Sequence, residues 1–282
     1  AKINAATGAE KTQLLNEVLG QVNMPYIVLA VIFILFGIFI KFLNLPEIQS
    51  EDDVVDNETG TAAVQHTSIF QFPHLFLGAL CIFVYVAAEV MAGDIIGVYG
   101  KELGINPDIS KYFTSLTLTG MLIGYIVGIF TIPKIMSQQA ALKICAILGI
   151  VFSVLAFTIK GKFYIDLDWN LFGANIVRAQ GDIYYSVIFI ALLGLANSLM
   201  WPAIFPLGIS HLGKFIKIGS AIMIMGIAGG AIWPLIYAFL KDTVGLNFQL
   251  AYFVTVLPCY MYILYFAISG HKVGLKGKVK GI

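Results

Sequence analysis

The sequence contains few charged residues. Lysine, arginine, aspartate and glutamate make up 12% of its 282 residues, whereas 59% of the residues are hydrophobic. Soluble domains contain about 25% charged residues, so this composition argues against a water-soluble globule and favours lipid as the main solvent of the chain. The formal net charge of +1 is uninformative about partners, and we expect no nucleic-acid partner.

Cysteine is also scarce, and the usual motifs of catalysis are missing. The three cysteines are Cys81, Cys145 and Cys259, and each falls within an apolar stretch. An odd number of cysteines in lipid is not a disulfide framework, and no Cys/His spacing predicts a metal site or a cofactor. The sequence also lacks Ser/His/Asp triads and phosphate-binding glycine loops. We therefore do not expect an enzyme.

The beginning of the sequence shows neither an initiator methionine nor a secretory signal peptide. It starts Ala1-Lys2-Ile3-Asn4, and residues 1–23 are polar enough to be a loop. Because seven apolar stretches follow this segment, we expect the chain to be a piece of a longer protein.

Seven apolar stretches, each about 20 residues long, predict seven transmembrane helices, because an α-helix of that length crosses the roughly 30 Å hydrocarbon core. Their expected bounds are about 24–43, 75–98, 112–132, 140–159, 183–206, 218–240 and 248–269. Pro25 is expected in the first turn of the first helix, where its missing N–H costs nothing. The predicted fold class is an all-α integral membrane bundle.

Two segments between these helices are expected to be irregular. Residues 44–74 predict a solvated acidic linker, because acidic side chains are frequent in them and few apolar residues could pack. These acidic residues are Glu47, Glu51, Asp52, Asp53, Asp56 and Glu58. Residues 160–182 predict a long mixed loop. The lysines of the short loops around Lys134 and Lys214, together with the basic tail, favour a cytoplasmic carboxyl terminus.

An ionisable residue lies inside an apolar helix at Glu89. A carboxylate at that depth costs on the order of 2.5–3.5 kcal/mol on insertion scales, so such residues face a cavity or a partner. Tyr85 lies four residues before Glu89 and therefore shares its helix face. The functional interpretation makes Glu89 an acceptor for sugar hydroxyls or a proton site. The structural alternative is a buried, protonated residue that is hydrogen-bonded within the bundle.

Asn197 and Trp201 form a similar pair just before Pro202. An amide offers donors and acceptors, and an indole ring suits the C–H surface of a sugar while its N–H binds a hydroxyl. The alternative is an interhelical hydrogen bond and an interfacial tryptophan. When Glu89 is aligned with Asn197, the last six spans divide into two triplets, which predicts two three-helix repeats of inverted topology. It also predicts that Glu89 and Asn197 point into a shared polar cleft.

Two rows of glycines predict close helix packing. Gly120, Gly124 and Gly128 form one row with a spacing of four residues, and Gly226, Gly229 and Gly230 form the other. Small residues at this spacing allow helix backbones to approach each other in a membrane.

Three stretches of the sequence together resemble the fucose and glucose/galactose symporter family, which is the sugar branch of the major facilitator superfamily. They are Tyr85-Val-Ala-Ala-Glu-Val-Met-Ala-Gly-Asp94, Asn197-Ser-Leu-Met-Trp-Pro-Ala-Ile-Phe-Pro-Leu-Gly208 and Gly219-Ser-Ala-Ile-Met-Ile-Met-Gly-Ile-Ala-Gly-Gly-Ala-Ile-Trp-Pro234. The resemblance extends from about residue 24 to residue 270.

This resemblance implies a twelve-helix transporter of which the chain supplies helices six to twelve. Residues 1–43 would be a loop and the last helix of the amino-terminal bundle, residues 44–74 the cytoplasmic linker, and residues 75–282 the carboxyl-terminal bundle with its basic tail. The implied function is symport of a hexose with a proton or sodium across the inner membrane by alternating access.

The resemblance also assigns roles to residues. It places Tyr85, Glu89, Asn197 and Trp201 on the sugar side of the bundle. The family's acidic residues for ion coupling lie in the amino-terminal bundle, so this sequence contains no counterpart for them. The partners implied are a sugar, a coupling cation, membrane lipid and the missing amino-terminal bundle.

A seven-helix receptor or sensor remains the alternative, because the count of seven spans also fits such proteins. A retinal protein would need a lysine in the middle of its last span, and residues 248–269 contain none. A receptor would usually show an extracellular disulfide, whereas these cysteines lie in apolar stretches. A membrane enzyme would need a catalytic cluster, and the sequence shows none.

Overall fold

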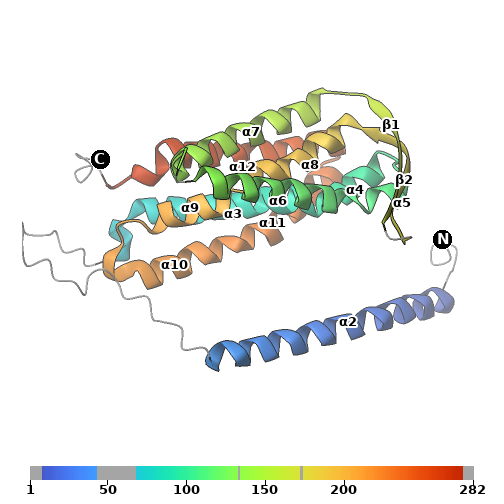
Figure 1. Ribbon diagram of the computed structural model, residues 1–282, viewed down its shortest axis with the longest axis horizontal. Coiled ribbons are helices and arrows are strands. Elements are labelled where there is room, and N and C mark those ends of the chain that lie inside the picture. The colour runs from blue at the N-terminus through green and yellow to red at the C-terminus, as the bar shows by residue number, and fades with distance from the viewer. Residues whose placement is uncertain (1–7, 43–67, 133, 172–173, 276–282) are drawn as a thin grey trace, which may run out of the picture. The chain divides into compact units, whose positions relative to one another are not determined.

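The computed structural model describes residues 8–42, 68–132, 134–171 and 174–275 (Figure 1). Most of the described residues are helical, and one antiparallel pair of strands accompanies the helices. The chain separates into two compact units, Ala1–Gln49 and Ser50–Ile282, which we describe separately.

In its described residues, the first unit contains one long helix, α2 (Ala9–Phe42), whose apolar part extends over Asn23–Phe39. The expected span at 24–43 is therefore helical as far as Phe42, and Leu43 lies outside the described residues. The expectation of a loop before this span was wrong, because the helix begins at Ala9. The segment contains good helix formers, including glutamate, lysine, glutamine and leucine. Pro25 consequently lies inside the helix and not in its first turn.

The second unit contains six helices long and apolar enough to cross a membrane, by length and composition. They cover Pro73–Gly93, Pro107–Thr131, Gln138–Thr158, Tyr185–Ile209, Gly213–Thr243 and Phe248–Ile268. All six lie over spans expected from the sequence. The individual α-helices of this unit are α3 (Pro73–Gly93), α4 (Ile95–Glu102), α5 (Pro107–Ser110), α6 (Phe113–Thr131), α7 (Gln138–Thr158), α8 (Tyr185–Asn197), α9 (Met200–Ile209), α10 (Ile216–Met225), α11 (Gly229–Ala238) and α12 (Phe248–Ile268).

Three of the spans expected from the sequence are interrupted in the structure. The second expected span ends at Gly93 and continues after Asp94 as the separate helix α4. The fifth is divided between α8 and α9, because Pro202 has no N–H to bond to the carbonyl of Ser198. The sixth contains a 3₁₀ segment, Gly226–Ala228, between α10 and α11.

Side chains from neighbouring helices bond the carbonyls at the end of α3. The Tyr252 hydroxyl donates to the carbonyl of Met91 at 3.2 Å, the Thr117 hydroxyl to Ala92 at 3.1 Å, and the Thr114 hydroxyl to Gly93 at 2.8 Å. Lipid offers no hydrogen bonds, so the polar groups at a helix end within the membrane need such partners. The interruption of α3 is therefore stabilised by α6 and α12.

The expectation of an irregular loop at 160–182 was wrong. The strands β1 (Lys162–Leu171) and β2 (Ala174–Tyr184) form an antiparallel pair in which Phe163 lies opposite Ile183. In β1, apolar residues alternate with Tyr164, Asp166 and Asp168, which is the period of a strand with one buried face. Phe163 and Ile165 pack against the core of the helices.

The neighbouring helices of the second unit form a regular pattern. The helix α3 packs against α10 and α11, and α6 packs against α8. The helix α12 packs against α3 and α7, and α7 packs against α8 and α12. In an inverted repeat, α3 would correspond to α8–α9, α6 to α10–α11, and α7 to α12. Under this correspondence, each observed pairing becomes another observed pairing or itself, as an inverted repeat requires. Superposition of the two triplets remains a prediction, to be checked by aligning experimental coordinates of the two halves.

The two glycine rows lie at related positions in these triplets. A Cβ atom added to Gly124 would come within 3.2 Å of the Leu195 carbonyl oxygen on α8. One added to Gly229 would lie 1.9 Å from the carbonyl oxygen of Phe83 on α3. Both rows therefore bring a helix close to the backbone of its neighbour, which confirms the interpretation of close packing.

Replacement of Gly229 by alanine tests this contact. We expect Gly229→Ala to destabilise the protein by about 1–3 kcal/mol, the usual effect of overpacking, because the added methyl group meets backbone atoms that cannot rotate away. The measurement is the midpoint of thermal unfolding in detergent. Gly97→Ala on α4 is the matched control, since nothing lies within 4 Å of its added Cβ atom. Equal midpoints for the two variants would contradict close packing at Gly229.

Candidate functional site

The four candidate residues lie on helices that contact one another. Tyr85 and Glu89 belong to α3, Asn197 ends α8, and Trp201 lies in the first turn of α9. The helix α3 packs against both α8 and α9. The interruption between α8 and α9 therefore separates Asn197 from Trp201 along the chain, while packing keeps both beside α3.

Aromatic contacts join the two candidate pairs. The ring centroids of Tyr85 and Trp201 lie 6.2 Å apart, with an angle of 57° between the rings. Trp201 in turn stacks with Phe205 at 6.1 Å. Tyr85 is 1% exposed, whereas Trp201 is partly exposed. Part of the Trp201 ring therefore remains accessible, and Tyr85 contacts this ring from the interior of the bundle.

Glu89 is partly exposed and lies among tyrosines. Its carboxylate is close enough to the hydroxyls of Tyr85, Tyr125 and Tyr260 to interact with them electrostatically. Among the residues described by the structure, no lysine, arginine or histidine forms an ion pair with Glu89. The polar surroundings of this carboxylate therefore include the tyrosine hydroxyls and the carboxylate of Asp94, which also interacts with it electrostatically.

Asn197 is buried in the interior of the bundle. The hydroxyl of Tyr260 on α12 donates a hydrogen bond of 2.9 Å to Oδ1 of Asn197, and both residues are 0% exposed. Nδ2 of Asn197 has no hydrogen-bond partner within the described ranges. The interhelical bond considered for Asn197 is therefore present. The expected shared polar cleft stays a prediction, because Glu89 and Asn197 approach each other through Tyr260.

Sequence reasoning did not single out Tyr260. Its ring packs on Gly149 of α7, where an added Cβ atom would lie 2.3 Å from Cδ1 of Tyr260. Tyr260 and Asn197 are 63 residues apart in the sequence. An apolar span with several tyrosines gives no signal of which one bonds a distant amide.

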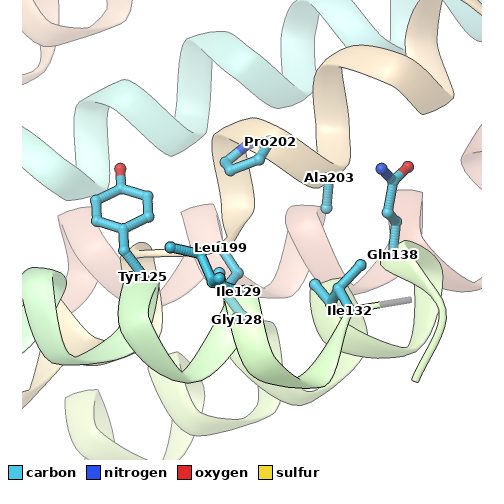
Figure 2. Close-up of a pocket in the computed structure, with 8 residues that line it drawn as sticks. All are labelled: Tyr125, Gly128, Ile129, Ile132, Gln138, Leu199, Pro202 and Ala203. Atoms are coloured by element: carbon cyan, nitrogen blue, oxygen red, sulfur yellow. The ribbon is translucent and has the colours of Figure 1, made fainter. Parts of the chain in front are cut away.

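A pocket of about 240 Å³ opens between α6, the start of α7 and α9 (Figure 2). It is lined by Tyr125, Gly128, Ile129, Ile132, Gln138, Leu199, Pro202 and Ala203. Its lining is mostly apolar and includes none of the four candidates. Tyr125, however, interacts with Glu89, and Pro202 follows Trp201. The pocket is thus a neighbour of the candidate residues and not the expected cleft.

The described part of the chain contains no group of three or more His, Cys, Asp or Glu residues that could hold a metal ion. The three cysteines are free and buried. The arrangement of carboxylate, amide, hydroxyl and indole groups suits the hydrogen bonding and stacking of an uncharged polar solute.

Loss of the Tyr260 hydroxyl tests the bond to Asn197. In Tyr260→Phe, the Asn197 amide would have no hydrogen-bond partner among the described residues, and an unsatisfied buried group costs about 1–3 kcal/mol. We expect a lower thermal unfolding midpoint in detergent. Tyr164→Phe, at a tyrosine that is 60% exposed, is the control and should unfold like the unmodified protein. If Tyr260→Phe also unfolds at the unmodified midpoint, the bond contributes nothing to stability.

Comparison with known proteins finds no matching family model but several relatives. A glucose/galactose transporter of Brucella abortus (strain 2308) is 30% identical over an aligned length of 284 residues. The alignment covers 96% of this chain and 58% of that protein. A putative glucose/galactose transporter of Helicobacter pylori (strain J99) is 31% identical over 255 residues, with coverage of 89% and 55%. The L-fucose-proton symporter of Escherichia coli (strain K12) is 26% identical over 246 residues, with coverage of 87% and 51%.

Solved structures with the same fold were also found. The major facilitator superfamily transporter FucP in its outward conformation matches with a TM-score of 0.64 and 22% sequence identity, over 94% of this chain and 58% of that one. A variant of the E. coli fucose:proton symporter matches with a TM-score of 0.65. The chain spans a little over half the length of these proteins.

These relatives are transporters and not enzymes. Together with the six apolar helices, they make the chain a multi-pass protein of the inner membrane. Over its matched length, the chain is similar in sequence to proteins named glucose/galactose transporter and has the fold of a major facilitator superfamily transporter.

Proposed function

We propose that the chain is the carboxyl-terminal part of a secondary active transporter that carries a hexose across the inner membrane by ion-coupled symport and alternating access. The observation that carries this proposal is the agreement between sequence and fold. Relatives named glucose/galactose transporter and L-fucose-proton symporter match 87–96% of the chain, and the fold match covers 94% of it.

The proposed domain assignment rests on the fact that the chain spans a little over half the length of its relatives. The helix α2 would be the last helix of an amino-terminal bundle, residues 44–74 would form the cytoplasmic linker, and residues 75–282 would form the carboxyl-terminal bundle and its tail. The division of the chain after Gln49 supports a separate first helix. The linker residues 44–67 lie outside the described ranges. A partner bundle would supply the other wall of an alternating-access site.

The coupling cation in this proposal is a proton or sodium. Two relatives carry the name L-fucose-proton symporter, which favours a proton. The candidate site of this chain contributes one carboxylate, Glu89. The residues that bind the coupling ion would lie in the amino-terminal bundle.

In the proposed site, the four candidates act in two layers. Glu89 and Trp201 are partly exposed, so a carboxylate and an indole ring would contact the sugar. The carboxylate would accept sugar hydroxyls, and the ring would cover the C–H face. Tyr85 and Asn197 are buried and would hold these groups in place from behind.

A seven-helix receptor or sensor is the alternative function. The relatives do not favour it, because the curated matches are named as transporters. The deciding experiment is uptake of labelled glucose, galactose and fucose by the full-length protein in a transport-deficient host. Uptake that requires a proton or sodium gradient would support symport. Binding without uptake would support the receptor.

Glu89→Gln tests the carboxylate in the full-length protein. Loss of a hydrogen bond to a charged group costs about 1.5–3 kcal/mol, so we expect sugar affinity to fall roughly ten- to hundredfold. Membrane insertion should be unchanged. The control is Asp166→Asn, which removes an exposed carboxylate on β1 and should leave uptake unchanged. Unaltered uptake kinetics in Glu89→Gln would make Glu89 a structural residue.

Trp201→Ala tests the stacking ring. We expect weaker sugar uptake with less loss of specificity between hexoses, because a ring face covers C–H surface without reading individual hydroxyls. The measurements are KM for each hexose and the amount of protein in the membrane. Normal KM values at normal expression would remove Trp201 from the site.

A further inference from the structure

The two ends of the helical unit differ in charge. We call the end at which α3 begins and α12 ends the basic end. Within its described segments, 68–74, 131–132, 134–143, 209–218 and 265–275, the charged residues are lysines and no aspartate or glutamate occurs. These lysines are Lys134, Lys143, Lys214, Lys217 and Lys272. The ion pairs observed in the described residues all lie at the opposite end. The lysines of the basic end therefore lack acidic partners within the described residues.

Packing of α7 against α12 brings two of these lysines together. Nε2 of Gln139 donates a hydrogen bond of 3.1 Å to the carbonyl of Ala267, which fixes the start of α7 to the end of α12. Lys143 lies one turn after Gln139, and Lys272 lies in the 3₁₀ turn that follows α12. The two ammonium groups thus belong to neighbouring elements at one level of the unit.

His271 lies close enough to Lys143 and Lys272 to interact with their positive charges. It is 7% exposed, and its Nδ1 is 2.9 Å from the carbonyl oxygen of Phe266. Burial lowers the pKa of His271, the hydrogen bond with Phe266 opposes this shift, and the charges of Lys272 and Lys143 lower the pKa further. Because the pKa of His271 is lowered, its imidazole is neutral at pH 7. Lys143 and Lys272 are therefore the cations where the start of α7 meets the turn after α12.

Apolar side chains extend from these lysines along the outside of both helices. On α7, Ile144, Ile147 and Val151 are each more than 40% exposed, and on α12 the same is true of Met261, Tyr265 and Ile268. The spacing of three and four residues places each set on one helix face. Both faces lie within helices of membrane-spanning length, so hydrocarbon is their natural solvent.

We propose that Lys143 and Lys272 bind the phosphate of an anionic phospholipid whose acyl chains lie along the exposed apolar faces of α7 and α12. Two cations that form no ion pair with an acidic residue in the described segments match a headgroup with a net negative charge. A zwitterionic headgroup fits less well, because its own ammonium group would meet the lysines. The site does not depend on sugar transport, since neither Lys143 nor Lys272 belongs to the four candidate residues and neither α7 nor α12 carries one of them.

Native mass spectrometry of the full-length protein in detergent tests this site, with dioleoylphosphatidylglycerol and dioleoylphosphatidylcholine as probes. We expect the unmodified protein to bind phosphatidylglycerol more tightly. Lys143→Gln/Lys272→Gln should weaken this binding by roughly fivefold for each lysine, the effect of one cation at an anionic membrane surface. Lys101→Gln/Lys160→Gln, at exposed lysines of the opposite end, is the matched control and should bind like the unmodified protein.

Four outcomes would overturn the proposal. Equal binding of the two lipids, or an unchanged affinity in Lys143→Gln/Lys272→Gln, would exclude a site at these lysines. An equal loss of phosphatidylglycerol affinity in the control variant would show that the total charge of the protein, and not the site at Lys143 and Lys272, attracts the lipid. Displacement of phosphatidylglycerol by millimolar inorganic phosphate would indicate a site for free anions. Thermal unfolding without added lipid confirms that each variant is folded.

Discussion

Direct contact between helix backbones at glycines determines the distances on which the rest of the bundle depends. Apolar side chains gain little by leaving lipid for a helix interface, so helices in membranes associate through close packing and hydrogen bonds. Gly229 places α11 against the carbonyl of Phe83, and Gly194 places α8 against the carbonyl of Thr117. These contacts fix α3 and α8, which carry Glu89 and Asn197. The candidate site is therefore positioned by glycines, which have no functional side chain.

The same contacts allow helices to be interrupted within the membrane. At the end of α3, hydroxyls of α6 and α12 bond the carbonyls of Met91, Ala92 and Gly93. An interruption without such donors would leave backbone groups unsatisfied in hydrocarbon, at a cost of several kcal/mol each. Close packing thus permits α3 to be interrupted within a few residues of Glu89, which is proposed to contact the sugar.

The apolar spans could be predicted from the sequence, because length and hydropathy decide which segments cross a membrane. The hairpin at Lys162–Tyr184 could also have been found, since its alternating apolar residues follow the period of a strand. The extension of α2 to Ala9 was missed because polar residues in a helix resemble a loop in hydropathy. The bond between Tyr260 and Asn197 could not be predicted, because it depends on how α8 and α12 pack. Packing of distant segments leaves no local pattern.

The environment of Glu89 fits the role proposed for this carboxylate in a larger transporter. A carboxylate within an apolar helix needs a cation, a proton or hydrogen-bond donors. The described residues surround Glu89 with tyrosine hydroxyls and form no ion pair with it. Its exposed part therefore has room for a donor from outside the unit, such as a sugar hydroxyl. A donor that arrives and leaves with each cycle gives the carboxylate different interactions in the loaded and empty states. Such a difference is what allows a solute to shift a conformational equilibrium.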